Sequence, residues 1–149
     1  MSDRKDKILV IDANIAERKI LSTYLRRENF CIETGRCLKD AVRKMSESCF
    51  LCLILDVELP EMKGYEAVSI IKRIDPEIKI IMTSKKNSKS LETRIRKQDI
   101  FYYFIKSFEK EELRIAIMNA LNRDRRKKTN HETTLSANDI DPDLKECGK

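Results

Sequence analysis

Short apolar runs and longer amphipathic segments alternate along the chain. Five runs rich in β-branched and aromatic residues have the length of β-strands, and they cover residues 7–11, 30–34, 50–55, 78–83 and 101–105. The third and fourth runs are apolar almost throughout, as is typical of strands that are covered on both faces. Apolar residues at helical spacing follow the runs, most clearly in segments 20–25, 38–45, 67–74 and 113–120. A further segment, 87–98, is the weakest predicted helix, since it has little beyond Leu91 and Ile95 to bury.

This alternation predicts an α/β protein with a three-layer α/β/α architecture. Strands that are separated by helices pair in parallel, and right-handed crossovers place the helices on both faces of the sheet. We therefore expect a doubly wound, five-stranded parallel sheet. The apolar period stops after residue 122, so we expect one domain over residues 1–122 and a charged, flexible tail over residues 123–149.

The composition is that of a single globular domain. The 149 residues are 41% hydrophobic, which is enough for a buried core. No apolar run approaches the roughly 18 residues of a membrane-spanning helix, and the first apolar stretch stops at Asp12, too early for a signal peptide. We therefore expect a cytoplasmic protein without membrane contact. The three glycines form neither GxGxxG nor GxxxxGK, which argues against a nucleotide-binding enzyme.

Basic residues are concentrated in two segments. Residues 85–97 hold six Lys or Arg and one acidic residue, and residues 123–128 hold five against one. The net charge of +6 is therefore spread unevenly, and these segments form two positive patches. Such patches attract acidic proteins or nucleic acid, although a solvated helix face is the simpler and commoner explanation. If the 85–97 face (Lys85–Lys97) binds a partner, we expect an acidic protein first and nucleic acid second.

Polar side chains follow the predicted strands at the points where four of them end. Asp12 follows the first run, Asp56 the third, Thr83 and Ser84 close the fourth, and Lys106 follows the fifth. In an open parallel sheet these ends meet at one edge, which is where ligands bind. Carboxylates are ligands for a hard divalent cation, whereas a hydroxyl and an ammonium suit phosphoryl oxygens. Since a carboxylate can also be a nucleophile, the set predicts a phosphoryl-transfer site.

Four segments, in this order, resemble the signature segments of the response regulator receiver (CheY-like) family. They read KILVID at 7–12, LCLILDVELPEMKGYE at 51–66, IIMTS at 80–84 and YFIKSF at 103–108. The resemblance covers about residues 6–121. It implies a flavodoxin-like fold and a signalling role in a two-component phosphorelay. Such a domain is not an enzyme in the usual sense, because at most it catalyses its own phosphorylation and dephosphorylation.

The resemblance implies roles for four residues in handling a phosphoryl group. Asp56 would accept the group from a histidine kinase or a phosphotransfer protein. Lys106 would bind the phosphoryl oxygens, and Ser84 would be the switch hydroxyl. Tyr103 would be the aromatic residue whose rotamer follows the state of the site.

The same resemblance implies a magnesium site, with one departure from the family pattern. Asp12 and Asp56 would bind the ion together with the backbone carbonyl of Glu58. The family usually has two acidic residues together after the first strand, but here the second position is Ala13. Because Mg²⁺ prefers near-ideal octahedral coordination, the missing carboxylate predicts weak binding unless water or the side chain of Glu58 fills the position.

Two further positions depart from the family pattern. Lys85 follows Ser84 where a small residue is usual, and it would either obstruct the phosphodonor or pair with Glu58 across the mouth of the site. Ser107 replaces the proline that usually follows the lysine. A cis bond before Ser would cost about 2.5–4 kcal/mol, so we expect the loop with Lys106 to be trans and differently aimed.

Two functional interpretations stay open. The first is a stand-alone receiver that is phosphorylated on Asp56 and signals through the face formed by its fourth helix, fifth strand and fifth helix. The second is a receiver-like module that binds proteins without phosphorylation, because Ala13 and Lys85 both disfavour transfer. A phosphatase of the haloacid-dehalogenase type is a distant third, since Asp56-x-Glu58 lacks the late acidic pair of that family. Tyr102 stands where dimeric receivers commonly have Asp, so we expect a monomer or a weak homodimer.

Overall fold

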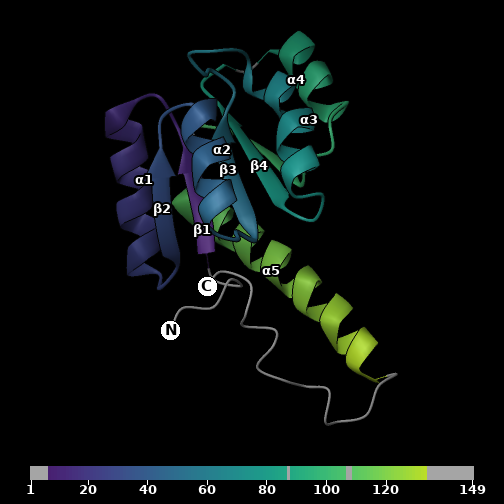
Figure 1. Cartoon of the computed structure of the whole chain (residues 1–149). Coiled ribbons are helices and arrows are strands. Elements are labelled where there is room, and N and C mark those ends of the chain that lie inside the picture. The colour runs from purple at the N-terminus through teal and green to yellow at the C-terminus, as the bar shows by residue number, and fades with distance from the viewer. Residues whose placement is uncertain (1–6, 87, 107–108, 134–149) are drawn as a thin grey trace.

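The fold is a five-stranded sheet between two layers of helices (Figure 1). It is seen in a computed structural model that describes residues 7–86, 88–106 and 109–133, with side chains up to residue 121. The strands are Lys7–Ile11 (β1), Cys31–Gly35 (β2), Cys52–Asp56 (β3), Lys79–Ser84 (β4) and Tyr102–Ile105 (β5). They pair in the order β2-β1-β3-β4-β5, and every pair is parallel. The predicted fold class is therefore confirmed.

Helices on both sides bury the two faces of this sheet. They are Ile15–Arg27 (α1), Leu38–Glu47 (α2), Gly64–Ile74 (α3), Lys89–Arg96 (α4) and Lys110–Thr133 (α5). Along β1, Ile8 and Val10 belong to the core under α1 and α5, while Leu9 and Ile11 belong to the core under α2, α3 and α4. Because successive side chains point to opposite faces, a strand buried on both sides is apolar at every position. This explains the continuous apolar runs in the sequence.

Two contacts shape the loop between β3 and α3, which borders the carboxyl edge of the sheet. The carboxylate of Glu61 accepts hydrogen bonds from the backbone N–H groups of Leu38 and Lys39, both at 3.0 Å, and so ties the loop to the start of α2. A Cβ atom at Gly64 would lie 2.3 Å from the backbone oxygen of Asp56, so only glycine fits this approach. The loop is therefore held at Glu61 by α2 and at Gly64 against the backbone of Asp56.

The C-terminal helix is longer than the apolar pattern predicts. It continues to Thr133, past the predicted domain boundary at residue 122. Lys and Arg are good helix formers, so the backbone stays helical where the apolar period has stopped. Figure 1 shows this end of α5 extending away from the sheet. The expected flexibility of residues 134–149 concerns a part of the chain outside the described residues.

Helix α4 is the shortest of the five, as the sparse apolar residues of its segment predict. It has eight residues, of which Ile95 is the buried one. Its N-terminus is capped by Ser88, whose hydroxyl accepts a hydrogen bond from the backbone N–H of Leu91 at 3.2 Å. In the described ranges, no helix is both long and apolar enough to span a membrane.

Candidate functional site at the carboxyl edge of the sheet

Four predicted site residues lie together at the carboxyl edge of the sheet. Asp12 follows β1, Asp56 and Ser84 end β3 and β4, and Lys106 follows β5. The backbone N–H of Lys106 donates to the carbonyl of Ser84 at 2.6 Å, so the pairing of β4 with β5 sets the position of this lysine. Asp12, Asp56 and Ser84 are almost completely buried. Since buried polar groups need partners, their contacts define what the site can do.

The ammonium group of Lys106 is the centre of the site. Its Nζ lies 2.8 Å from Oδ2 of Asp12 and 3.3 Å from Oδ1 of Asp56, and it donates a further hydrogen bond to Oε1 of Glu17. Burial disfavours the ammonium, but the hydrogen bonds to Asp12 and Glu17 and the charge of Asp56 outweigh burial and raise the pKa of Lys106. The side chain is therefore a cation that three carboxylates share.

The loop between β1 and α1 holds Asp12 in place. Oδ1 of Asp12 accepts a hydrogen bond from the backbone N–H of Asn14 at 2.9 Å, and the Asp12 carbonyl accepts one from Nη1 of Arg18 at 2.6 Å. The side chain of Asn14 caps α1 by accepting from the backbone N–H of Glu17 at 3.0 Å. This cap places Glu17 in the first turn of α1, at the same edge of the sheet as Asp12.

Asp56 is buried beside a like charge. Burial is the main reason why the pKa of Asp56 rises from 3.8 to about 6, and the negative charge of Asp12 adds to the rise. Lys106 and the backbone N–H of Glu58 act in the opposite direction without cancelling the shift. The carboxylate is mostly ionised at neutral pH, where it can act as a nucleophile.

Glu17 is the site residue that the sequence patterns do not indicate. One of its oxygens contacts Lys106, and Oε2 lies 3.4 Å from Nζ of Lys85. Burial alone would raise the pKa of Glu17, but the hydrogen bonds and charges of Lys106 and Lys85 outweigh it and lower the pKa. Its sequence signal is a Glu three residues after Asn14, which the N-terminus of a helix explains by itself. Only the fold shows that this side chain reaches Lys106.

Glu58 lies beside the cluster and has a partner of its own. Its Oε1 accepts a hydrogen bond from Nζ of Lys63 at 2.7 Å, and both side chains are about half exposed. The pair of Lys85 with Glu58, one of the two options for Lys85, is therefore wrong, because Lys85 contacts Glu17 instead. Ser107 lies outside the described residues, so the bond that precedes it stays a prediction.

Ser84 and Tyr103 meet at one backbone carbonyl. The hydroxyl of Ser84 donates to the carbonyl of Lys86 at 3.2 Å and accepts from the N–H of the same residue at 3.0 Å. The hydroxyl of Tyr103 donates to that carbonyl at 3.3 Å. Burial raises the pKa of Tyr103, and the hydroxyl of Ser84 acts in the opposite direction through a hydrogen bond. The two predicted switch residues are thus linked through the backbone of Lys86.

The site offers two buried carboxylates to a cation. Asp12 and Asp56 both approach Nζ of Lys106, so their oxygens converge on one positive charge. Ala13 is exposed and supplies no side-chain oxygen. Within the described part of the chain, no group of three or more His, Cys, Asp or Glu side chains is arranged to hold a metal ion. The donor set suits Mg²⁺, which is often bound by one or two carboxylates and several waters.

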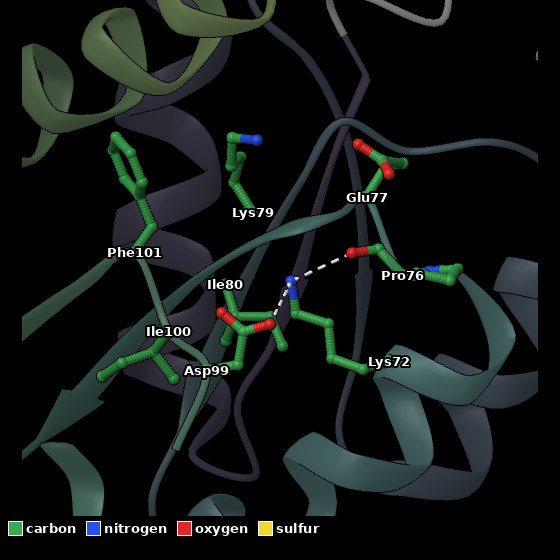
Figure 2. A pocket seen from close by; sticks show the side chains of 8 residues that line it. All are labelled: Lys72, Pro76, Glu77, Lys79, Ile80, Asp99, Ile100 and Phe101. Atoms are coloured by element: carbon green, nitrogen blue, oxygen red, sulfur yellow. Dashed lines mark hydrogen bonds and ion pairs between the residues drawn. The ribbon is translucent and has the colours of Figure 1, made fainter. Parts of the chain in front are cut away.

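A hollow of about 380 Å³ lies at the opposite end of the sheet, beside the start of β4. Lys72 of α3 crosses it (Figure 2). Nζ of Lys72 donates to the carbonyls of Pro76 and Ile78, at 3.4 Å and 2.7 Å, and lies 3.5 Å from Oδ2 of Asp99. These contacts make Lys72 a brace between the two loops that flank the hollow.

Comparisons with known proteins agree with the fold. Residues 8–118 match the family model for the response regulator receiver domain. The response regulator protein TodT of Pseudomonas putida is 31% identical over 121 residues, which are 81% of this chain and 53% of TodT. The transcriptional regulatory protein SrrA of Staphylococcus aureus is 26% identical over 79% of this chain and 48% of SrrA. The chain thus spans about half the length of these curated relatives.

Solved structures share the same arrangement of sheet and helices. A CheY-like receiver domain protein from Methanospirillum hungatei JF-1 superposes with a TM-score of 0.76 at 20% identity, over 82% of this chain and 98% of that one. The BeF3-activated DrrB receiver domain gives a TM-score of 0.71 at 26% identity, over 78% of this chain and 97% of that one. A receiver domain protein from Clostridium thermocellum gives 0.74 at 26% identity, over 80% and 96%.

Proposed function

The chain belongs to the response regulator receiver family, and on this premise we propose that Asp56 accepts a phosphoryl group from a histidine kinase or a phosphotransfer protein. Receiver domains are signalling domains rather than typical enzymes. The observation that supports the proposal most strongly is the position of Lys106, whose ammonium lies 3.3 Å from Oδ1 of Asp56 at the edge of the sheet where ligands bind.

The transfer step needs an ionised carboxylate and a stabilised phosphoryl group. An oxygen of Asp56 forms a bond to phosphorus while the P–N bond of the phosphohistidine breaks, and the electron pair leaves with the imidazole nitrogen, which is protonated. Asp56 is mostly ionised above its pKa of about 6. The ammonium of Lys106 stabilises the charge on the phosphoryl oxygens. The hydroxyl of Ser84 gives up its hydrogen bond to the carbonyl of Lys86 and donates to a second phosphoryl oxygen.

Receiver domains generally bind Mg²⁺ at their acidic site. In this chain the ligands would be the carboxylates of Asp12 and Asp56 and the backbone carbonyl of Glu58, and the ion would neutralise negative charge around the transferred group. We infer that the affinity is low, because Ala13 supplies no oxygen and the side chain of Glu58 is paired with Lys63. Water would complete the coordination shell.

The proposed output surface is the face formed by α4, β5 and α5. Tyr103 connects this face to the site, because its hydroxyl and that of Ser84 meet at the carbonyl of Lys86. Six basic side chains are exposed in residues 85–97, the segment that contains α4: Lys85, Lys86, Lys89, Arg94, Arg96 and Lys97. Such a surface attracts an acidic protein partner, with nucleic acid as the second option. A partner affinity that falls strongly with added salt would support recognition by charge, whereas an affinity that is independent of salt would contradict it.

The direct test of phosphorylation is the intact mass of the protein after incubation with acetyl phosphate and Mg²⁺. We expect the gain of one phosphoryl group, which is lost in Asp56→Asn and on chelation of Mg²⁺. Asp99→Asn is the matched control, because Asp99 lies at the opposite end of the sheet and pairs with Lys72. A folded protein that gains no mass would contradict the proposal.

A second function, protein binding without phosphorylation, is favoured by two observations. Ala13 removes a carboxylate from the magnesium site, and the ammonium of Lys106 is already occupied by three carboxylates. This alternative predicts that Asp56→Asn leaves partner binding unchanged, which pull-down with the unmodified and the substituted protein would show.

A further inference from the structure

We propose that Glu17 is a positioning residue that holds Lys106 in the unphosphorylated protein and competes with the phosphoryl group for it. This inference rests on the proposed phosphorylation of Asp56. It adds a residue of α1 that controls how readily the site takes up a phosphoryl group.

The contacts of Lys106 show which partners hold it at rest. Its Nζ hydrogen-bonds to Asp12 and to Glu17, whereas Oδ1 of Asp56 lies farther away, at 3.3 Å. An ammonium has three donors, of which Asp12 and Glu17 take two, so the one that faces Asp56 is left for a phosphoryl group on that residue. Lys106 can turn a second donor to the phosphoryl oxygens only if it gives up Asp12 or Glu17.

Glu17 is the partner that can leave. Its side chain is 28% exposed, against 2% for Asp12, so the carboxylate of Glu17 can be rehydrated at a lower cost than that of Asp12. Lys85 lies on the solvent side and contacts the other oxygen of Glu17 at 3.4 Å. After Lys106 has moved to the phosphoryl group, Glu17 keeps Lys85 as its counter-ion.

The charge of Glu17 opposes phosphorylation in a second way. The carboxylate lies at the entrance to a site that already holds Asp12 and Asp56, and a phosphodonor is an anion that must approach the same edge. Like charges repel more strongly where water is partly excluded. Competition for Lys106 and repulsion of the donor act in the same direction, so removal of the charge speeds uptake.

The test is the rate of phosphorylation of Glu17→Gln by acetyl phosphate at saturating Mg²⁺, with Glu28→Gln as the matched control. Glu28 follows the last turn of the same helix, about 16 Å along its axis from Glu17, and carries one exposed ion pair. We expect Glu17→Gln to be phosphorylated about three to five times faster than the native protein, and Glu28→Gln to match the native rate. The affinity for beryllofluoride, which needs Lys106 but involves no transfer, is expected to rise by a similar factor.

Three results would overturn the inference. If the native protein is phosphorylated and Glu17→Gln reacts at the same rate or more slowly, Glu17 does not compete for Lys106. If the rate rises but the affinity for beryllofluoride does not, Glu17 acts on the transfer step and does not compete for Lys106. A double-mutant cycle in urea, with Glu17→Gln and Lys106→Met, tests the resting contact without phosphorylation, and strictly additive effects would contradict it. If the native protein takes up no phosphoryl group, the proposed function itself fails, which is a different outcome.

Discussion

Two buried lysines, at opposite ends of the sheet, have opposite surroundings. Lys7 begins β1, and its side chain is 10% exposed. Nζ of Lys7 lies 2.9 Å from Oε2 of Glu33 and 2.9 Å from the hydroxyl of Ser48. Lys44 also contacts Glu33, at 3.3 Å, so two lysines share one carboxylate. At the carboxyl edge the ratio is reversed, because Lys106, 12% exposed, is shared by three carboxylates.

The difference between the two clusters is one of charge balance. Beside Lys7, Glu33 has two cations, and Phe50 adds its ring 5.3 Å from the ammonium of Lys7. Around Lys106 the carboxylates are in excess, and burial together with the charge of Asp12 raises the pKa of Asp56 to about 6. The Lys7 cluster has one positive charge in excess and offers nothing to a further cation, whereas the negative excess around Lys106 attracts one. The comparison therefore separates a structural lysine from a functional one.

The largest effect should come from removing the two lysines in turn. Lys106→Met is expected to slow phosphorylation by acetyl phosphate about 100-fold, because the charge that stabilises the phosphoryl oxygens is lost. Lys7→Met should leave the rate unchanged and lower the unfolding free energy by about 1–2 kcal/mol, since Glu33 keeps Lys44. The increase of intact mass with time gives the phosphorylation rate, and urea unfolding curves give the free energy of unfolding. Equal effects of the two substitutions on the phosphorylation rate would contradict the distinction between a structural and a functional lysine.

The charge excess also predicts how stability depends on pH. The folded pKa of Asp56, about 6, lies above its unfolded value, so protonation of Asp56 favours the folded state, and this contribution is lost as pH rises from about 4 to 6. Asp56→Asn should therefore raise the unfolding free energy at pH 7 by about 1–3 kcal/mol, with little gain near pH 4. Urea unfolding with EDTA at both pH values measures this. Asp99→Asn, at an exposed position, is the control, and a gain independent of pH would contradict the assignment.

Restoring the missing acid should strengthen cation binding. Ala13→Asp adds a carboxylate next to Asp12, and we expect it to tighten Mg²⁺ binding about tenfold, because the ion gains an oxygen ligand. Isothermal titration calorimetry measures the affinity. Ala16→Asp is the control, since Ala16 is exposed in the first turn of α1 and the substitution adds the same charge. Equal affinities for both variants would mean that the missing ligand does not limit the site.

The smallest effect concerns Lys85, whose side chain is 59% exposed and turned toward Glu17. If Lys85 draws Glu17 away from Lys106, Lys85→Ala should slow phosphorylation by acetyl phosphate about twofold. The same substitution in a Glu17→Gln background should then have no effect. A faster reaction of Lys85→Ala would instead support the expectation that this side chain obstructs the donor.

The order and kind of the elements could be predicted from the sequence because they depend on local patterns. Continuous apolar runs occur where strands are buried on both faces, and helical spacing occurs where one face is buried. The positions of Asp12, Asp56, Ser84 and Lys106 follow from the same patterns, since the carboxyl ends of parallel strands meet at one edge. The end of α5 at Thr133 could not be read in this way, because a charged helix has no apolar period.

The partners within the site were decided only by the tertiary structure. Glu17 reaches Lys106, Lys85 reaches Glu17, and Glu58 pairs with Lys63. Long charged side chains have several rotatable bonds, and they choose among nearby partners by differences of a few ångströms and by competition between charges. The sequence by itself determined which groups gather at the carboxyl edge. Which of them hold one another depends on distances across α1, β4 and β5, and only the folded chain sets these.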